Sequence, residues 1–291
     1  MIHALESAAI VHTMTADLRS RTHALAREFV VPHLVIVEGV DAMRVLDTGS
    51  ASEVNTYVHR KIEAATGVGI VATHVPVPTS ELLDRIEWFN DDPDVTGMIL
   101  EIPIPGLEGE EADAVAMAMN ANKAVDNQGA EQVWGMGATP EATIRLLDTN
   151  PDRDFSGKGQ TVMVVGSEGH VGAQVVEEYS HRAVKDLICI DQGKGDLAKG
   201  AAAADIIIAA TGVRGIITAD MIHNGQAIVS VGANDVHPDA RKLTDLDFWL
   251  TPKVGGVGPS TTMHLFGRVV MLAEGGEPMH PFRPALTSAE R

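Results

Sequence analysis

The feature that most constrains the fold is an alternation of short, β-branched apolar runs with segments of helical periodicity. In the first half, strands are expected at 32–39, 68–75 and 95–106, and helices at 4–28, 52–67 and 79–92. In the second half, strands are expected at 161–166, 186–191, 204–212 and 226–232, and helices at 169–183 and near 260–273. Strands that alternate with helices in this way pair in parallel. The chain is therefore expected to be an α/β protein.

Length and composition narrow the class further. The 291 residues suit two α/β domains, and the segment SGKGQ (156–160) has the composition of a linker before the second series of strands. A net charge of -18 argues against non-specific binding of nucleic acid. No apolar run is long enough for a membrane span, and the N-terminus lacks the pattern of a secretory signal. We expect a cytoplasmic protein that binds neither nucleic acid nor membranes.

The cysteine and histidine content disfavours metal binding and disulfide formation. Cys189 is the single cysteine, which excludes an internal disulfide framework and a multi-cysteine zinc site. The twelve histidines include no HExxH pair. We expect no metal.

The stretch VVGSEGHVG joins an expected strand to an expected helix. Gly166, Gly169 and Gly172 lie three apart, which is not the GxGxxG spacing of a dinucleotide site. Small residues there let backbone N–H groups approach a pyrophosphate, although an ordinary tight turn gives the same pattern. Asp191 ends the next strand, where such folds place the acid that binds the adenosine ribose. An acid there favours NAD over NADP; the alternative is a turn or helix-capping Asp.

Several other residues are candidates for a site. Tyr57 and Lys61 lie one helical turn apart, so both project from one face of the expected helix. Glu101 lies at the end of an apolar strand, where a carboxylate is either paired, with Lys61 as a candidate partner, or exposed to water. Asp126 stands among turn residues and needs no function as a turn Asp. The glycine-rich loop GGVGPSTT (255–262) permits close approach of a ligand to the backbone.

Taken together, seven stretches resemble one family in order and spacing. They are YVHRK, EIPIPG, NKAVDNQG, ATP (138–140), VVGSEGHVG, ADIIIAATG and TPKVGGVGPSTT. The chain resembles the methylenetetrahydrofolate dehydrogenase/methenyltetrahydrofolate cyclohydrolase family over roughly residues 1 to 275. The resemblance implies a two-domain α/β fold: a folate-binding catalytic domain (1–146 with 261–291) and a Rossmann-like NAD(P)-binding domain (147–260). It also implies that the C-terminal helix returns to the first domain, and a homodimer.

The resemblance also implies roles for residues. Lys61 would be the central catalytic lysine, Tyr57 would stack on the aminobenzoate of the folate, and Asp126 would bind the pterin. Glu101 is included among the catalytic residues. The other substrate-binding residues implied are Pro103, Gly255, Gly256, Gly258 and Pro259. The cofactor-binding residues implied are Thr139, Gly166, Ser167, Glu168, His170, Val171, Gly172, Asp191, Ala210, Thr211 and Gly212.

The chain departs from the family pattern at positions that bear on activity. Glu101 replaces a glutamine that contacts the lysine, and a carboxylate there favours the charged lysine, which then accepts protons poorly. An arginine of the cofactor turn is replaced by Ser167-Glu168. Asn127 replaces a glycine after the pterin aspartate, and the segment 40–51 is longer than usual.

Three interpretations follow. The first is a dehydrogenase that oxidises 5,10-methylenetetrahydrofolate with NAD and has weak or no cyclohydrolase activity. The second is an ordinary bifunctional enzyme that uses NADP and tolerates Glu101. The third is a non-catalytic folate- or nucleotide-binding relative, motivated by the two acids Glu101 and Glu168.

Overall fold

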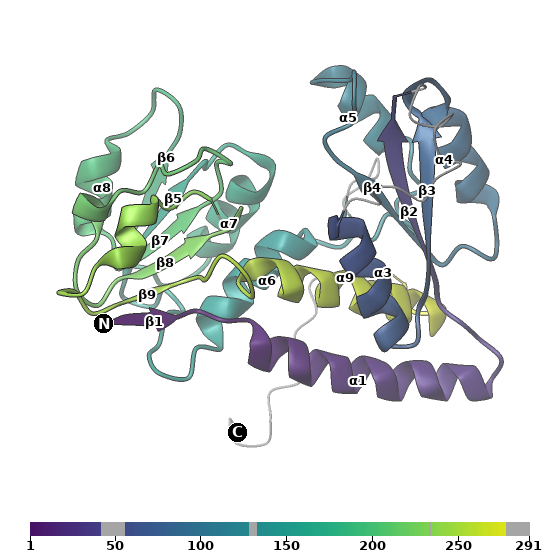
Figure 1. The fold of residues 1–291 in the computed structure, drawn as a ribbon, viewed down its shortest axis with the longest axis horizontal. Helices are drawn as coiled ribbons and strands as arrows, with labels where there is room; N and C mark the ends of the chain where they lie inside the picture. Colours follow the sequence, from purple (N-terminus) through teal and green to yellow (C-terminus); the bar gives the residue numbers. More distant parts are fainter. Residues whose placement is uncertain (42–55, 128–132, 233, 278–291) are drawn as a thin grey trace. The chain divides into compact units, whose positions relative to one another are not determined.

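The computed structural model describes residues 1–41, 56–127, 133–232 and 234–277. Most of the long segment 40–51 and the expected helix start at 52 therefore lie outside the described residues. The chain forms two compact units (Figure 1). Unit 1 comprises Met1–His12 and Gly137–His264, and unit 2 comprises Thr13–Met136 and Leu265–Arg291. Both units contain a parallel sheet with helices, which confirms the two-domain α/β prediction.

Unit 2 is built on a three-stranded parallel sheet in the order β3-β2-β4. Its strands are β2 (His33–Val40), β3 (Val71–Pro78) and β4 (Gly97–Glu101), and its helices include α3 (Thr56–Gly67), α4 (Leu82–Asp91, after the short 3-10 helix η1, Thr79–Glu81) and α5 (Glu110–Met117). Val35, Val37 and Leu100 pack with Leu82, Ile86 and Val115, so α4 and α5 cover one face. Side chains alternate along a strand, so Glu38 and Glu101 project from the opposite face.

Unit 1 is built on a six-stranded sheet in the order β1-β9-β8-β7-β5-β6, and every pair is parallel. Its strands are β1 (Ile2–Ala4), β5 (Thr161–Val165), β6 (Asp186–Ile190), β7 (Ile206–Ala209), β8 (Ala227–Ser230) and β9 (Phe248–Leu250). Its helices are α6 (Ala138–Asp148), α7 (His170–Ser180), α8 (Leu197–Ala203) and the 3-10 helices η2 (Ala219–Met221) and η3 (Pro238–Lys242). β5 has β6 on one side and β7 on the other, so the strand order reverses there. Such a switch point is where open parallel sheets bind ligands.

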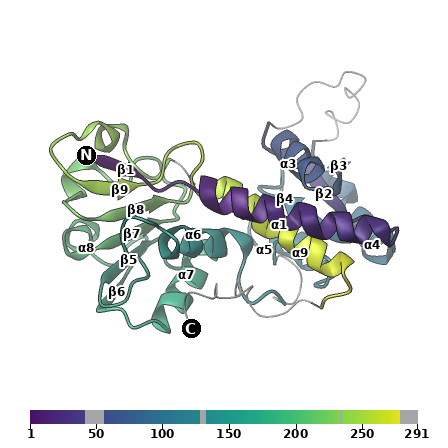
Figure 2. The same ribbon diagram turned by 90° about the horizontal axis from the view of Figure 1, so that it is seen from below.

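Two helices belong partly to each unit. α1 (Ala8–Arg27) passes from unit 1 to unit 2 after His12, and α9 (Val257–Ala273) does so after His264 (Figure 2). The second half of α9 thus belongs to unit 2, which contains β2, β3 and β4, as the resemblance implied for the C-terminal helix. No helix among the described residues is long and apolar enough to cross a membrane.

The N-terminus differs from the prediction of a helix over 4–28. Residues 2–4 form β1 and pair with β9, and the helix begins only at Ala8. The reason is long-range, because backbone pairing with residues 248–250 outweighs local helical periodicity. The ring of His3 also stacks on Trp249, with the ring centroids 4.6 Å apart.

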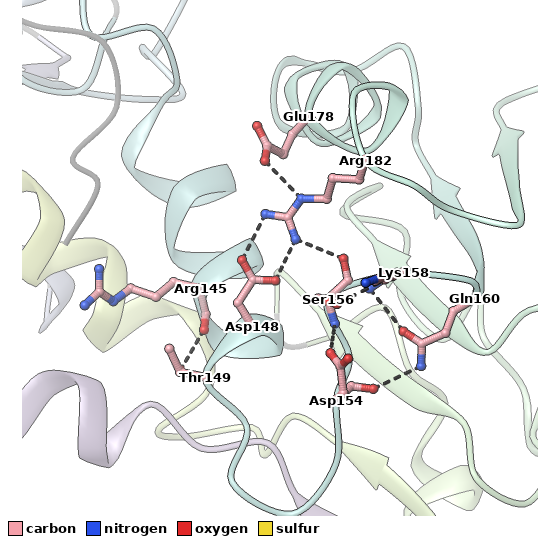
Figure 3. Close-up of polar contacts among 10 residues, drawn as sticks. Arg145, Asp148, Thr149, Asp154, Ser156, Lys158, Gln160, Glu178 and Arg182 are labelled. Atoms are coloured by element: carbon pink, nitrogen blue, oxygen red, sulfur yellow. Dashed lines mark hydrogen bonds and ion pairs between the residues drawn. The ribbon is translucent and has the colours of Figure 1, made fainter. Parts of the chain in front are cut away.

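The segment 156–160 is a bonded turn inside unit 1 rather than a flexible linker. Arg182, two residues after the end of α7, donates to both carboxylate oxygens of Asp148 at 2.6 and 2.9 Å and to the carbonyl of Ser156 at 3.0 Å (Figure 3). The side chain of Gln160 accepts from the backbone N–H of residue 157 at 3.0 Å. The guanidinium therefore ties the ends of α6 and α7 to the turn that leads into β5.

Candidate active site

A lysine–carboxylate pair lies on the face of the unit 2 sheet that is opposite α4 and α5. Lys61 on α3 forms an ion pair with Glu101 at the end of β4, and the two side chains are only 10% and 14% exposed. This contact places α3 over the face opposite α4 and α5. The alternative that Glu101 is an ordinary strand-terminal carboxylate in water is therefore wrong.

Tyr57 completes the same face of α3. The Lys61 ammonium lies 5.0 Å from the centre of the Tyr57 ring, within reach of a cation–π interaction. Burial raises the pKa of Tyr57, and the negative charges of Glu101 and Asp126 raise it further. The phenol is thus neutral at physiological pH, and half of the residue is exposed and able to meet a ligand. The structure brings Tyr57, Lys61 and Glu101 together, and Asp126 lies near enough for its charge to act on the Tyr57 phenol.

The backbone around Asp126 explains one departure from the family pattern. Asn127 has a φ of +61°, the left-handed conformation that glycine and asparagine adopt most readily. Its side-chain oxygen accepts from the backbone N–H of Trp134 at 3.2 Å. Asparagine therefore supplies the conformation that a glycine would supply, and adds a bond across the loop.

Arg268 supports the same segment and was not found by sequence analysis. This α9 residue is 5% exposed and donates to the carbonyls of Val125 at 2.9 Å and Met136 at 2.6 Å. Its guanidinium lies 5.2 Å from the ring centre of Trp134. Arg268 is the one Arg, Lys, Asp or Glu residue of α9, and this is the sequence signal that could have indicated it.

A second acid–base pair lies beside the first on the sheet. Glu38 on β2 is the register partner of Glu101 on β4, so their side chains leave the same face one strand apart. His74 on β3 contacts the Glu38 carboxylate at 2.8 Å, and both side chains are largely buried. Sequence analysis missed this pair, although a glutamate inside the apolar run HLVIVEGV was a visible signal.

The remaining residues predicted to bind substrate are distributed over both units. Pro103 is exposed in unit 2, two residues after Glu101, and its peptide bond with Ile102 is cis. The others belong to unit 1: Gly255, Gly256, Gly258 and Pro259. Gly255 has a φ of +87°, and its carbonyl accepts from the backbone N–H and the hydroxyl of Ser7 at 2.9 and 3.0 Å. Ser7 thus holds the start of the glycine loop.

The turn from β5 into α7 requires its glycines. Gly166 has a φ of +83°, and a Cβ on Gly172 would lie 1.9 Å from the Gly166 carbonyl oxygen. Among the described residues, the buried hydroxyl of Ser167 has no hydrogen-bond partner and no side chain caps the N-terminus of α7, where His170 and Val171 form the first turn. Unpaired donors at a helix start fit the pyrophosphate of a dinucleotide.

Asp191 stabilises the turn after β6, which is the alternative to a ribose-binding role that the sequence left open. Its two oxygens accept from the backbone N–H groups of Glu168 and Gln192, each at 2.8 Å. The bond from Glu168 is the main reason that the pKa of Asp191 is lowered. Lys194 contacts the Glu168 carboxylate at 2.5 Å, and this bond raises the pKa of the lysine. The negative charge of Glu168 beside the turn is therefore matched by a cation.

The other predicted cofactor residues flank this turn in unit 1. Ala210 follows β7 and donates its backbone N–H to the carbonyl of Val165 at 2.9 Å. Thr211 and Gly212 follow it and bond to Asp235, a buried carboxylate that sequence analysis did not single out. Thr139 lies in the first turn of α6, and the preceding Gly137 donates to Gln174 of α7 at 2.6 Å.

Comparisons with known proteins agree with this architecture. The family model described as the catalytic domain of tetrahydrofolate dehydrogenase/cyclohydrolase matches residues 5–126, and the model of its NAD(P)-binding domain matches residues 137–276. "Bifunctional protein FolD" of Variovorax paradoxus (strain S110) is 30% identical over 93% of this chain and 97% of its own length. The corresponding protein of Paraburkholderia xenovorans (strain LB400) is 31% identical over 93% and 96%.

A solved structure shows the same fold. The 5,10-methylenetetrahydrofolate dehydrogenase of the silkworm, Bombyx mori, superposes with a TM-score of 0.77 and 24% identity, covering 94% of this chain and 99% of its own. The chain therefore belongs to the tetrahydrofolate dehydrogenase/cyclohydrolase family, as a divergent member with a catalytic domain and an NAD(P)-binding domain. The resemblance found in the sequence is confirmed.

Proposed function

We propose that this protein oxidises 5,10-methylenetetrahydrofolate to 5,10-methenyltetrahydrofolate by hydride transfer to NAD, and that its cyclohydrolase activity is weak or absent. The observation that carries the proposal is the buried ion pair between Lys61 and Glu101. Hydrolysis of the methenyl product requires a group that takes up a proton from water. In this pair the Lys61 ammonium donates to the Glu101 carboxylate, so the lysine is engaged with a buried anion and is not held ready to take up that proton.

Oxidation makes smaller demands on the same residues. NAD, when bound, supplies the acceptor for the hydride. The chain has to position the folate, and the neutral, half-exposed Tyr57 ring offers a stacking surface for its aminobenzoate. Lys61 supplies a fixed positive charge beside the ring, and Asp126 accepts hydrogen bonds from the pterin. Positioning of this kind accounts for a large part of the rate of a transfer reaction.

The preference for NAD rests on charge at the end of β6. Asp191 is ionised, because hydrogen bonds from two backbone N–H groups lower its pKa. A 2′-phosphate at this position would meet that carboxylate and the nearby Glu168, whereas ribose hydroxyls can donate to the remaining lone pairs of Asp191. The only cation in contact with Glu168 among the described residues is Lys194. Because the charge of Lys194 is already paired with Glu168, it does not offset the charge of Asp191 that a 2′-phosphate would meet.

The proposal is tested by following absorbance after mixing the purified protein with 5,10-methylenetetrahydrofolate and either NAD or NADP. We expect dehydrogenation with NAD and decay of the methenyl product at the uncatalysed rate. Fast decay together with a preference for NADP would establish the second candidate, the bifunctional enzyme, which is favoured by the name of the FolD relatives. Silence with both cofactors, with ligand binding retained, would establish a binding protein instead.

A further inference from the structure

A fully buried carboxylate lies behind the loop that follows β7. Asp235 is 0% exposed and stands in the segment after β8. Its Oδ1 accepts from the backbone N–H of Thr211 at 3.3 Å, the Thr211 hydroxyl at 3.1 Å and the backbone N–H of Gly212 at 3.1 Å. Its Oδ2 accepts from the Ser230 hydroxyl at 2.9 Å and the backbone N–H of Gly232 at 3.2 Å.

Five donors converge on one side chain because a buried charge is tolerated only when it is hydrogen-bonded. The donors come from the ends of two neighbouring strands, since Ala209 of β7 is the register partner of Ser230 of β8. Asp235 therefore fixes the carboxyl ends of both strands, at the edge of the sheet where a ligand of this fold binds.

The direction of these bonds decides what the loop can offer to a ligand. The N–H groups of Thr211 and Gly212 are turned inward to Asp235, and the Thr211 hydroxyl is also committed, because it accepts from the backbone N–H of Val213 at 3.0 Å. Gly212 is exposed, with a φ of +66° and open space where a Cβ would stand. The backbone N–H of Ala210 is also engaged, with the carbonyl of Val165. The polar groups that residues 210–212 can still offer to a ligand are therefore their carbonyl oxygens, which are acceptors.

We propose that Asp235 is a positioning residue for the dinucleotide: it holds residues 210–212 so that carbonyl oxygens face the ligand, and these accept from hydrogen-bond donors of the nicotinamide half of the cofactor. The donors are the carboxamide NH₂ or the ribose hydroxyls, and a phosphate is disfavoured at the loop. The inference rests on the proposed function, because it presumes that NAD is the ligand of unit 1.

The experiment measures NADH binding by fluorescence titration, independently of turnover. We expect Thr211→Val to weaken NADH binding about tenfold, because one bond to a charged acceptor is lost and the loop is freed. Thr211→Ser keeps the hydroxyl and should restore binding to within about threefold, as rescue by the conservative residue. Ser230→Ala, on the other oxygen of Asp235, should weaken binding in the same direction while the KM for the folate stays constant.

Cofactor analogues distinguish the two kinds of donor. An NADH analogue with an acetyl group in place of the carboxamide should lose affinity for the wild type but not for Thr211→Val if the NH₂ is the donor. An analogue lacking a hydroxyl of the nicotinamide ribose should show this pattern if the ribose is the donor.

Equal NADH affinity of the wild type, Thr211→Val and Ser230→Ala would overturn the inference, and so would equal losses for Thr211→Val and Thr211→Ser. Failure of the proposed function appears separately, as absence of folate oxidation by a wild-type protein that binds NADH normally.

Discussion

Glu101 and Glu168 are two departures from the family pattern that look alike in the sequence and differ in the structure. Each carboxylate forms an ion pair with a lysine, Glu101 with Lys61 and Glu168 with Lys194. The first pair is buried, with side chains 14% and 10% exposed, whereas the second is in water, with side chains 63% and 56% exposed. Charges in a buried pair are screened little, and their separation costs several kcal/mol; charges of an exposed pair are screened by solvent and salt.

Glu101 and Glu168 therefore differ in their expected effect on function. Glu101 acts directly on the lysine that a folate would meet, so it supports a change in activity. Glu168 is neutralised at the surface, so it gives little reason to doubt cofactor binding. The interpretation as a non-catalytic relative was motivated by both acids, and only Glu101 still supports it.

The largest effect is expected from Lys61→Met. We expect folate oxidation to fall at least about 100-fold, since the fixed positive charge beside the substrate is removed. Glu101 is left buried without its partner, at a cost of about 3–5 kcal/mol in the free energy of unfolding. The double variant Lys61→Met/Glu101→Gln should recover that stability in denaturant titrations without recovering activity. Full oxidation by the folded double variant would remove Lys61 from the mechanism.

Glu101→Gln tests the buried half of the comparison. The neutral amide replaces the ion pair with a weaker hydrogen bond and frees the lysine to meet substrate water, so hydrolysis of methenyltetrahydrofolate should rise about tenfold or more while oxidation changes only a few-fold. Glu178→Gln is the matched control, because Glu178 pairs with Arg182 in unit 1 and lies outside the candidate site. If decay of the methenyl product is as slow in Glu101→Gln as in the wild type, the electrostatic explanation is wrong.

Arg268→Met asks whether the support of Asp126 matters for the folate. The variant keeps an unbranched apolar stem but leaves two buried carbonyls without donors, so we expect a loss of about 2–4 kcal/mol in stability and a several-fold rise in KM for the folate. Arg182→Met removes a comparable set of bonds in unit 1. It should lower stability without changing that KM. Parallel changes of KM in both variants would show a merely structural role for Arg268.

Asp191 gives a smaller, pH-dependent effect. Its pKa is lowered in the folded protein by the backbone N–H of Glu168, so the bonds of the turn are fully present above the ordinary carboxyl pKa. They are lost only as pH falls through the lowered value. The Kd for NADH should therefore stay level from neutral pH down to about pH 4 and rise below it. A rise that begins near pH 6 would point to another group.

The sequence predicted those parts of the molecule whose cause is local. The strands other than β1 and β9 follow from β-branched runs, and Tyr57 and Lys61 share a face because of helical spacing. β1 and β9 were missed because each is three residues long and is held by the other across the whole chain. α6 was not predicted, although Pro140 in its first turn is compatible with a helix because a proline there breaks no helical hydrogen bond.

The parts of the candidate site that were missed all depend on partners distant in the sequence. Arg268 lies 143 positions from the carbonyl of Val125 to which it donates. Glu38 lies beside Glu101 only because of the strand register. Asp235 contacts a loop that precedes it by 23 and 24 positions, and this contact exists only in the folded chain. A single sequence gives neither register nor tertiary contacts, so the isolated charges of Glu38 and Arg268 were visible in it but their partners were not.

Lys194→Ala should have the smallest effect and completes the comparison with Lys61. Removal of the cation leaves Glu168 unneutralised beside the turn, so NADH binding should weaken about twofold at low salt and return to the wild-type value at about 0.5 M salt, where charges in water are screened over a few ångströms. The melting temperature should not change, because an exposed pair contributes little to stability. A loss of binding that persists at high salt would mean that Lys194 contacts the cofactor directly, and the exposed pair would then carry as much function as the buried one.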